Sequence, residues 1–134
     1  MDKLNLILLV DDDDTTNYLN KRLLERMQIA EEIEIVTNGE EALQFLDDRA
    51  ASELPLPDLM FLDIKMPVMD GFEFLETYHQ LPDHLKQGIV VMMLTSSASF
   101  YDLERLKQYS TVQRHISKPL QEAHVREILQ EHFS

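Results

Sequence analysis

The sequence predicts an α/β fold in which one sheet of five parallel strands is covered by helices on both faces. Short apolar runs alternate with longer segments of helical periodicity along the chain. Several runs are apolar at every position, as is typical of parallel strands buried on both faces. Parallel strands joined through helices require right-handed crossovers, which produce an open, doubly wound sheet.

Five apolar runs have the length of a strand. They lie at residues 6–10, 33–36, 59–62, 89–94 and 112–116. The first helix is expected over residues 15–28, with Asp14 or Thr15 as the N-cap because their side chains can accept hydrogen bonds from the first turn. Its predicted apolar stripe consists of Leu19, Leu23, Leu24 and Met27.

Four more segments carry apolar residues three or four positions apart, which predicts four more helices. They are 40–51 with Ala42, Leu43, Leu46 and Ala50; the segment after Gly71 with Phe72, Leu75 and Tyr78; 99–109 with Phe100, Leu103 and Leu106; and 121–133 with Val125, Ile128 and Leu129. Residues 50–57 and 81–88 are expected to be loops.

Length and charge narrow the class of protein. A chain of 134 residues suits one domain, and we expect residues 1–134 to form it without an output domain. No secretory signal or membrane-spanning run is visible, so we expect a cytoplasmic protein. The absence of cysteine excludes thiolate chemistry. The net charge of −13 does not favour direct binding to nucleic acid.

Charged and hydroxyl side chains follow four of the predicted strands. Acidic residues 11–14 come after the first, Asp63 after the third, Thr95 at the end of the fourth, and Lys118 after the fifth. Ligands of open α/β sheets bind outside the carboxyl ends of the strands. We therefore expect these side chains to converge at one edge of the sheet.

The residue types predict phosphoryl chemistry with a divalent cation. Carboxylates gathered at one edge repel each other, and Mg²⁺ relieves that repulsion with few protein ligands, for which Asp11, Asp12 and Asp63 suffice. Asp63 can then act as a nucleophile toward a phosphoryl group. Thr95 and Lys118 supply a hydroxyl donor and a cation for the charge of the transferred group.

Simpler interpretations exist for each residue taken alone. Residues 11–14 could be a solvated charge run that caps a helix, Asp63 could form a turn, and Thr95 could cap a helix. A calcium-binding EF-hand is excluded, because Thr16 stands where that loop needs glycine and Arg22 where it needs glutamate.

At these residues the chain resembles the receiver domains of response regulators from bacterial two-component systems. The resemblance covers essentially the whole chain and implies a flavodoxin-like fold of three layers, with strand order 2-1-3-4-5. The motifs that carry it are Leu9-Val10-Asp11-Asp12, Asp63 with Met66-Pro67 and Asp70-Gly71, Leu94-Thr95-Ser96, and Lys118-Pro119.

The resemblance also implies roles for individual residues. Asp63 would be the phosphoacceptor, and Thr95 and Lys118 would contact the phosphoryl oxygens. The ligands of Mg²⁺, or of Mn²⁺ as a substitute, would be Asp11, Asp12, Asp63 and the main-chain carbonyl of Lys65. Phosphorylation would shift the face built from the fourth helix, the fifth strand and the fifth helix.

Some positions depart from the common receiver pattern. His115 stands where receivers often carry a switching tyrosine or phenylalanine, so it is either an altered switch or an ordinary half-buried strand residue. Lys65 and Ser97 occupy positions that tune phosphoryl lifetime in the family. Residues 109–117 lack the Gly-Ala-Asp-Asp pattern of receivers that dimerise to drive DNA-binding domains.

We therefore expect a stand-alone signalling switch that is not a metabolic enzyme. Its partners would be a histidine kinase or histidine phosphotransfer protein and an unidentified downstream protein, without nucleic acid or membrane, and the chain would be a monomer or weak homodimer. One alternative is a receiver that binds proteins without phosphate. Another is an aspartyl-phosphate phosphatase of the haloacid-dehalogenase type, although Lys65 replaces the second acid of that class.

Overall fold

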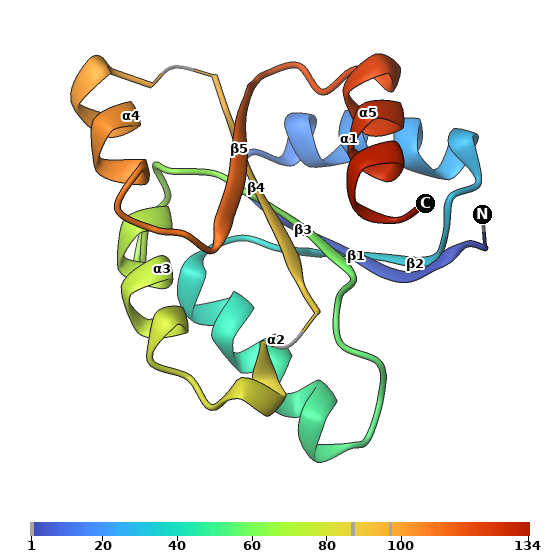
Figure 1. The fold of residues 1–134 in the computed structure, drawn as a ribbon, viewed down its shortest axis with the longest axis horizontal. Coiled ribbons are helices and arrows are strands. Elements are labelled where there is room, and N and C mark those ends of the chain that lie inside the picture. Colours follow the sequence, from blue (N-terminus) through green and yellow to red (C-terminus); the bar gives the residue numbers. More distant parts are fainter. Residues whose placement is uncertain (1, 87, 97) are drawn as a thin grey trace.

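The computed structural model describes residues 2–86, 88–96 and 98–134. Parallel strands form one sheet in the order β2-β1-β3-β4-β5, which confirms the predicted topology (Figure 1). The strands are β1 (Leu4–Val10), β2 (Ala30–Val36), β3 (Leu59–Leu62), β4 (Val90–Thr95) and β5 (Val112–Ser117).

Helices cover both faces of this sheet, as Figure 1 shows. Helices α1 (Asp14–Met27) and α5 (Glu122–His132) lie on one face, where Leu24 and Ile128 are fully buried. The opposite face packs against α2 (Gly39–Ala51), α3 (Gly71–His79) and α4 (Phe100–Leu106), and a short 3₁₀ helix, η1 (Asp83–Leu85), lies in the predicted loop 81–88.

The apolar residues of the strands divide between these two cores. Leu9 and Phe61 face the α1 and α5 side, whereas Val10 and Leu62 face the other. This alternation follows from the period of two along a strand, and it explains why the runs are apolar throughout. Among the residues that the structure describes, no helix combines the length and apolarity that crossing a bilayer requires.

Three details of the predicted helices are wrong. The N-cap of α1 is Asp13, whose side chain accepts a hydrogen bond from the Thr16 amide at 3.1 Å. Leu19 is 56% exposed and Phe100 is 79% exposed, although both were expected to face the core. The rest of the predicted stripe, Leu23, Leu24 and Met27, does pack against the core, and Asn17 and Asn20 are buried on the same helix.

Candidate functional site

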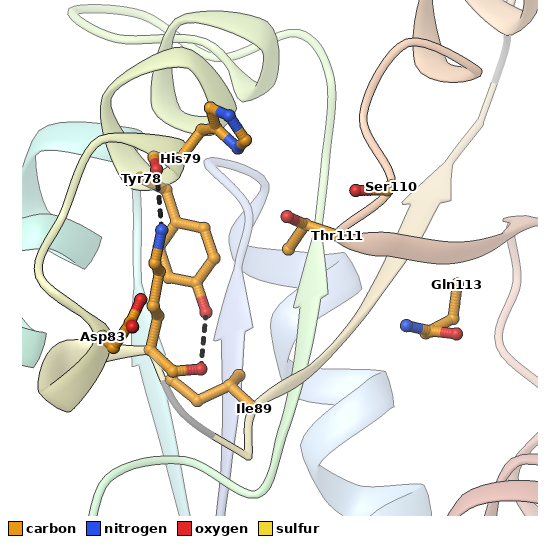
Figure 2. Close-up of a pocket in the computed structure, with 8 residues that line it drawn as sticks. Tyr78, His79, Asp83, Ile89, Ser110, Thr111 and Gln113 are labelled. Carbon is orange, nitrogen blue, oxygen red and sulfur yellow. Dashed lines mark hydrogen bonds between the residues drawn. The ribbon is translucent and has the colours of Figure 1, made fainter.

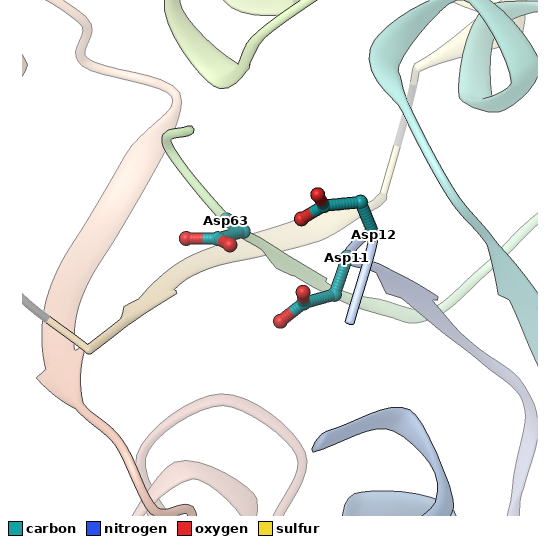
Figure 3. Close-up of side chains that lie close together, drawn as sticks. All are labelled: Asp11, Asp12 and Asp63. Atoms are coloured by element: carbon teal, nitrogen blue, oxygen red, sulfur yellow. The ribbon is translucent and has the colours of Figure 1, made fainter. Parts of the chain in front are cut away.

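Strand pairing brings the acidic residues of two strand ends together. Val10 pairs with Leu62, so the residues that follow them, Asp11 and Asp63, end adjacent parallel strands. The Asp63 amide donates to the Val10 carbonyl at 3.0 Å, which extends this pairing by one step. Carboxylate oxygens of Asp11, Asp12 and Asp63 lie within 4.8 Å of one another, and Figure 3 shows the three side chains gathered there.

Lys118 joins this acidic group from the far side of the sheet. Its main-chain amide donates to the Thr95 carbonyl at 2.9 Å, which fixes the end of β5 beside the end of β4. Its ammonium Nζ lies 2.6 Å from Oδ2 of Asp11 and 3.2 Å from Oδ2 of Asp63. The peptide bond from Lys118 to Pro119 is cis. Through these two contacts of Nζ, the Lys118 ammonium bridges the buried carboxylates of Asp11 and Asp63.

The charges of this group alter one another's protonation. Burial raises the pKa of Asp63 above 3.8, and the negative charge of Asp11 raises it further, while Lys118 only partly opposes this rise. Burial would lower the pKa of Lys118, but its contacts with Asp11 and Asp63 outweigh burial and raise it above 10.5. The lysine is thus held as a cation, and a further cation near Asp63 would relieve the remaining repulsion.

The turn after Asp63 is held close to the sheet edge. Gly71 donates its amide to the Ile64 carbonyl at 2.7 Å, and a Cβ at this position would overlap the Asp63 carbonyl oxygen and lie 3.0 Å from Cα of Ile64. Only glycine allows this approach. Within the turn between Ile64 and Gly71, Val68 adopts a φ of 68°, a strained value for a β-branched residue.

These elements enclose a polar pocket of about 280 Å³ at the carboxyl end of the sheet. The pocket contains every predicted chemical residue that the structure describes, apart from His115. It is lined by Asp11, Asp12, Asp13, Thr16, Asp63, Lys65, Thr95, Ser96 and Lys118. Thr95 is 3% exposed at the end of β4. Ser97, predicted to tune phosphoryl lifetime, lies outside the described residues.

Sequence reasoning missed Asp13 and Thr16 as part of the pocket wall. Asp13 caps α1, and its amide donates to Oδ1 of Asp11 at 3.0 Å, so the cap also holds the buried acid. The preference of aspartate for N-caps was the available signal, but Asp13 and Asp14 could not be distinguished without the helix boundary.

His115 lies on β5, paired with Met93, and is not among the residues that line this pocket. Its side chain is half-buried, and burial lowers its pKa below 6.5, which favours the neutral ring. Its buried Nε2 atom has no hydrogen-bond partner within the part of the chain that the structure describes.

Another hollow, of about 480 Å³, lies at the opposite end of the sheet between the end of α3 and the start of β5 (Figure 2). Several of its polar groups already bind each other. The Lys86 ammonium donates to the His79 carbonyl at 2.6 Å, and the Tyr78 hydroxyl donates to the Lys86 carbonyl at 3.4 Å. It lacks the cluster of three acids that marks the first pocket.

The model of the response regulator receiver domain matches residues 7–130. The chain belongs to this family. Its receiver domain is 34% identical over 116 residues to the probable methanogenesis regulatory protein FilR2 of Methanothrix harundinacea, covering 86% of this chain and 72% of that protein. It is 37% identical over 92 residues to the response regulator Rcp1 of Synechocystis, covering 68% of this chain and 62% of Rcp1.

The fold of the receiver domain agrees with solved structures. A two-component response regulator from Cytophaga hutchinsonii superposes with a TM-score of 0.86 at 29% identity, and the match covers 96% of each chain. The predicted family and flavodoxin-like fold are therefore confirmed, and the receiver domain acts in two-component signalling. Its acidic group is compatible with Mg²⁺, on which receiver domains generally depend.

Proposed function

We propose that this receiver domain is a phosphorylation-controlled switch in which Asp63 accepts a phosphoryl group. The donor is a phosphohistidine on a histidine kinase or a histidine phosphotransfer protein. The arrangement that carries the proposal is the Asp63 carboxylate in a pocket of about 280 Å³, with Asp11 and Asp12 within 4.8 Å and the Lys118 ammonium at 3.2 Å.

In the proposed transfer, a carboxylate oxygen of Asp63 forms a bond to phosphorus while the phosphorus–nitrogen bond of phosphohistidine breaks. The electron pair of the broken bond leaves with the imidazole, which departs as the neutral ring after gaining a proton. The product is an aspartyl phosphate, and water can later hydrolyse it back to Asp63 and inorganic phosphate.

Asp11, Asp12, Asp63 and the main-chain carbonyl of Lys65 would hold Mg²⁺, or Mn²⁺ in its place. The three carboxylates fit a hard cation, since their oxygens lie within 4.8 Å of one another and both burial and the charge of Asp11 raise the pKa of Asp63. When bound, the cation neutralises charge that develops on the phosphoryl oxygens.

Lys118 and Thr95 would stabilise the phosphoryl group from the other side. The Lys118 ammonium already binds Oδ2 of Asp63, so phosphoryl oxygens on Asp63 would come within its reach. Thr95 ends the adjacent strand β4 and lines the same pocket. Lys65 lines its exposed rim, where it would affect the access of water.

The output would be a shift of the face formed by α4, β5 and α5, with His115 as an altered switch residue. This makes the chain a signalling module and not a metabolic enzyme. Its downstream target would be a protein, because the charge of −13 disfavours nucleic acid. A cytoplasmic location and a monomeric or weakly dimeric state complete the proposal.

The test uses beryllofluoride, which mimics a phosphoryl group, together with Mg²⁺. We expect a set of amide NMR shift changes around residues 63, 95 and 118 that requires both reagents and differs from the changes produced by Mg²⁺ alone. Asp63→Asn should abolish them. Asp58→Asn is the matched control, because Asp58 precedes the same strand at its other end and accepts a hydrogen bond from the Asn5 amide at 2.6 Å, which asparagine can also accept.

A wild-type protein without Mg²⁺-dependent shifts would contradict the switch and favour a receiver that works without phosphate. Incubation with acetyl phosphate separates the remaining alternative. A switch forms one labile adduct per chain and turns over slowly, whereas continuous rapid release of phosphate from a small phosphate ester would indicate a phosphatase.

A further inference from the structure

The inner face of α1 is unusually polar below the acidic pocket. Asn17 is 3% exposed and Asn20 is 5% exposed, whereas Leu19 of the same helix is 56% exposed. Burying a side-chain amide opposes folding unless its polar atoms find partners. Packing alone would place an apolar residue at these positions, so the contacts of the two asparagines are informative.

Asn17 binds the main chain at the end of β1. Its Nδ2 atom donates to the Asp11 carbonyl oxygen at 2.8 Å in a buried hydrogen bond, and its own amide donates to the Asp13 carbonyl at 3.0 Å. The Asp11 carbonyl belongs to the planar peptide unit that leads into Asp12. Asn17 therefore sets the plane of the peptide from which the Asp12 carboxylate projects.

The other amide atom of Asn17 is not satisfied. Its buried Oδ1 has no hydrogen-bond partner among the described residues. The side chain borders a small void beneath Asp11 and Asp63 that has no room for a water molecule and that Asn20 also lines. An unpaired buried acceptor destabilises the folded state, so stability alone does not account for asparagine at this position.

We infer that Asn17 is a positioning residue of the metal site: it holds the peptide between Asp11 and Asp12 so that both acids present oxygen atoms to one cation beside Asp63. The inference rests on the proposed function, which supplies the cation. Partners that orient metal ligands typically change metal affinity by about 10-fold to 100-fold when they are removed. Asn20 borders the same void but forms no hydrogen bond with Asp11 in the described structure, which makes it the natural comparison.

The test measures binding of Mg²⁺ alone to the folded protein, by amide NMR shifts and by titration calorimetry. Asn17→Leu and Asn17→Ala both remove the Nδ2 donor to the Asp11 carbonyl. Leucine keeps a bulky side chain at this position, whereas alanine does not. We expect each to weaken Mg²⁺ binding about 10-fold or more. Their Mg²⁺-free Tm should fall little, since loss of the unpaired Oδ1 offsets loss of the hydrogen bond. Asn20→Leu should bind Mg²⁺ within about threefold of wild type.

Wild-type affinity in both Asn17 variants would overturn the inference while leaving the proposed function intact. An equal loss in Asn20→Leu, or a loss of affinity that simply follows the fall in Tm, would show general loosening of α1 and would also overturn it. Failure of the wild-type protein to bind Mg²⁺ would instead refute the metal site itself, and the inference with it.

Discussion

Strands β1, β3 and β4, which carry Asp11, Asp63 and Thr95 to the acidic pocket, are more deeply buried than β5 at the edge of the sheet. In β3 all residues are buried, and in β1 and β4 nearly all are, whereas β5 has one buried residue, Ile116, and otherwise half-buried or exposed ones. The acidic pocket therefore sits on a closely packed base. The α4–β5 corner is more exposed, with Leu106 as the buried residue of α4 and Ile116 as that of β5.

Specific side-chain contacts hold that corner to the rest of the molecule. The Tyr109 hydroxyl donates to a carboxylate oxygen of Glu76 on α3 at 2.7 Å, and the Arg105 guanidinium lies 4.1 Å from the centre of the Phe72 ring. Phe72 directly follows Gly71, which packs on the Asp63 main chain. A region with few buried apolar residues can change position at low cost, which suits the face that would transmit the signal.

Gly71→Ala tests the rigidity of the pocket and should have the largest effect on stability. The added Cβ would meet main-chain atoms of Asp63 and Ile64, which cannot yield as a flexible side chain could. We expect the free energy of unfolding in urea to fall by about 3 kcal/mol. Gly88→Ala is the control, since its φ of 82° is strained but nothing lies within 4 Å, and it should cost about 1 kcal/mol. Equal losses in the two variants would contradict a tightly packed turn.

Asp63→Asn tests whether the negative charge of Asp63 in the pocket lowers the free energy of unfolding of the protein. The pKa of Asp63 is about 3.8 in the unfolded chain and higher in the folded protein. Between the unfolded and the folded pKa, the folded state therefore binds more protons than the unfolded state. As pH rises through that window, ionisation of Asp63 therefore lowers the free energy of unfolding. The protein remains less stable by this amount at neutral pH.

Asparagine removes the charge, and its one side-chain oxygen can still accept the hydrogen bond from the Ile64 amide. The bond from Lys118 to Oδ2 is lost, but Lys118 keeps its contact with Asp11 at 2.6 Å. We expect Asp63→Asn to raise the free energy of unfolding by about 1 kcal/mol at pH 7, and the gain to disappear at a pH below 3.8. Urea denaturation at several pH values measures it, with Asp12→Asn as the control at an exposed acid. A gain that did not depend on pH would contradict this origin.

Tyr109→Phe tests the contacts at the corner and should have the smallest effect. It removes the hydrogen bond to Glu76 but keeps the ring, 6.3 Å from that of Phe72. We expect a loss of about 1 kcal/mol or less, with faster hydrogen exchange in α4 and little change around Asp63. Tyr101→Phe, at a residue that is 71% exposed, should leave both measurements unchanged. Faster exchange at the pocket would mean that the two regions are not separate.

Most of the fold could be predicted because strands buried on both faces have a simple sequence pattern. The runs at 59–62 and 89–94 match β3 and β4 closely, and they place Asp63 and Thr95 at strand ends. The helices were less certain. Leu19 and Phe100 fit an apolar spacing but are exposed, because the face that a helix buries depends on how it packs against the sheet.

The pattern of apolar runs and the polar residues that end them were enough to predict the doubly wound sheet and the meeting of Asp11, Asp63, Thr95 and Lys118, since parallel strands end at one edge. The packing of α1, which buries Asn17 under that site, and the lysine bridge between two acids arise only when distant segments pack together. Side-chain contacts of that kind depend on three-dimensional distances, which local spacing along the chain does not contain.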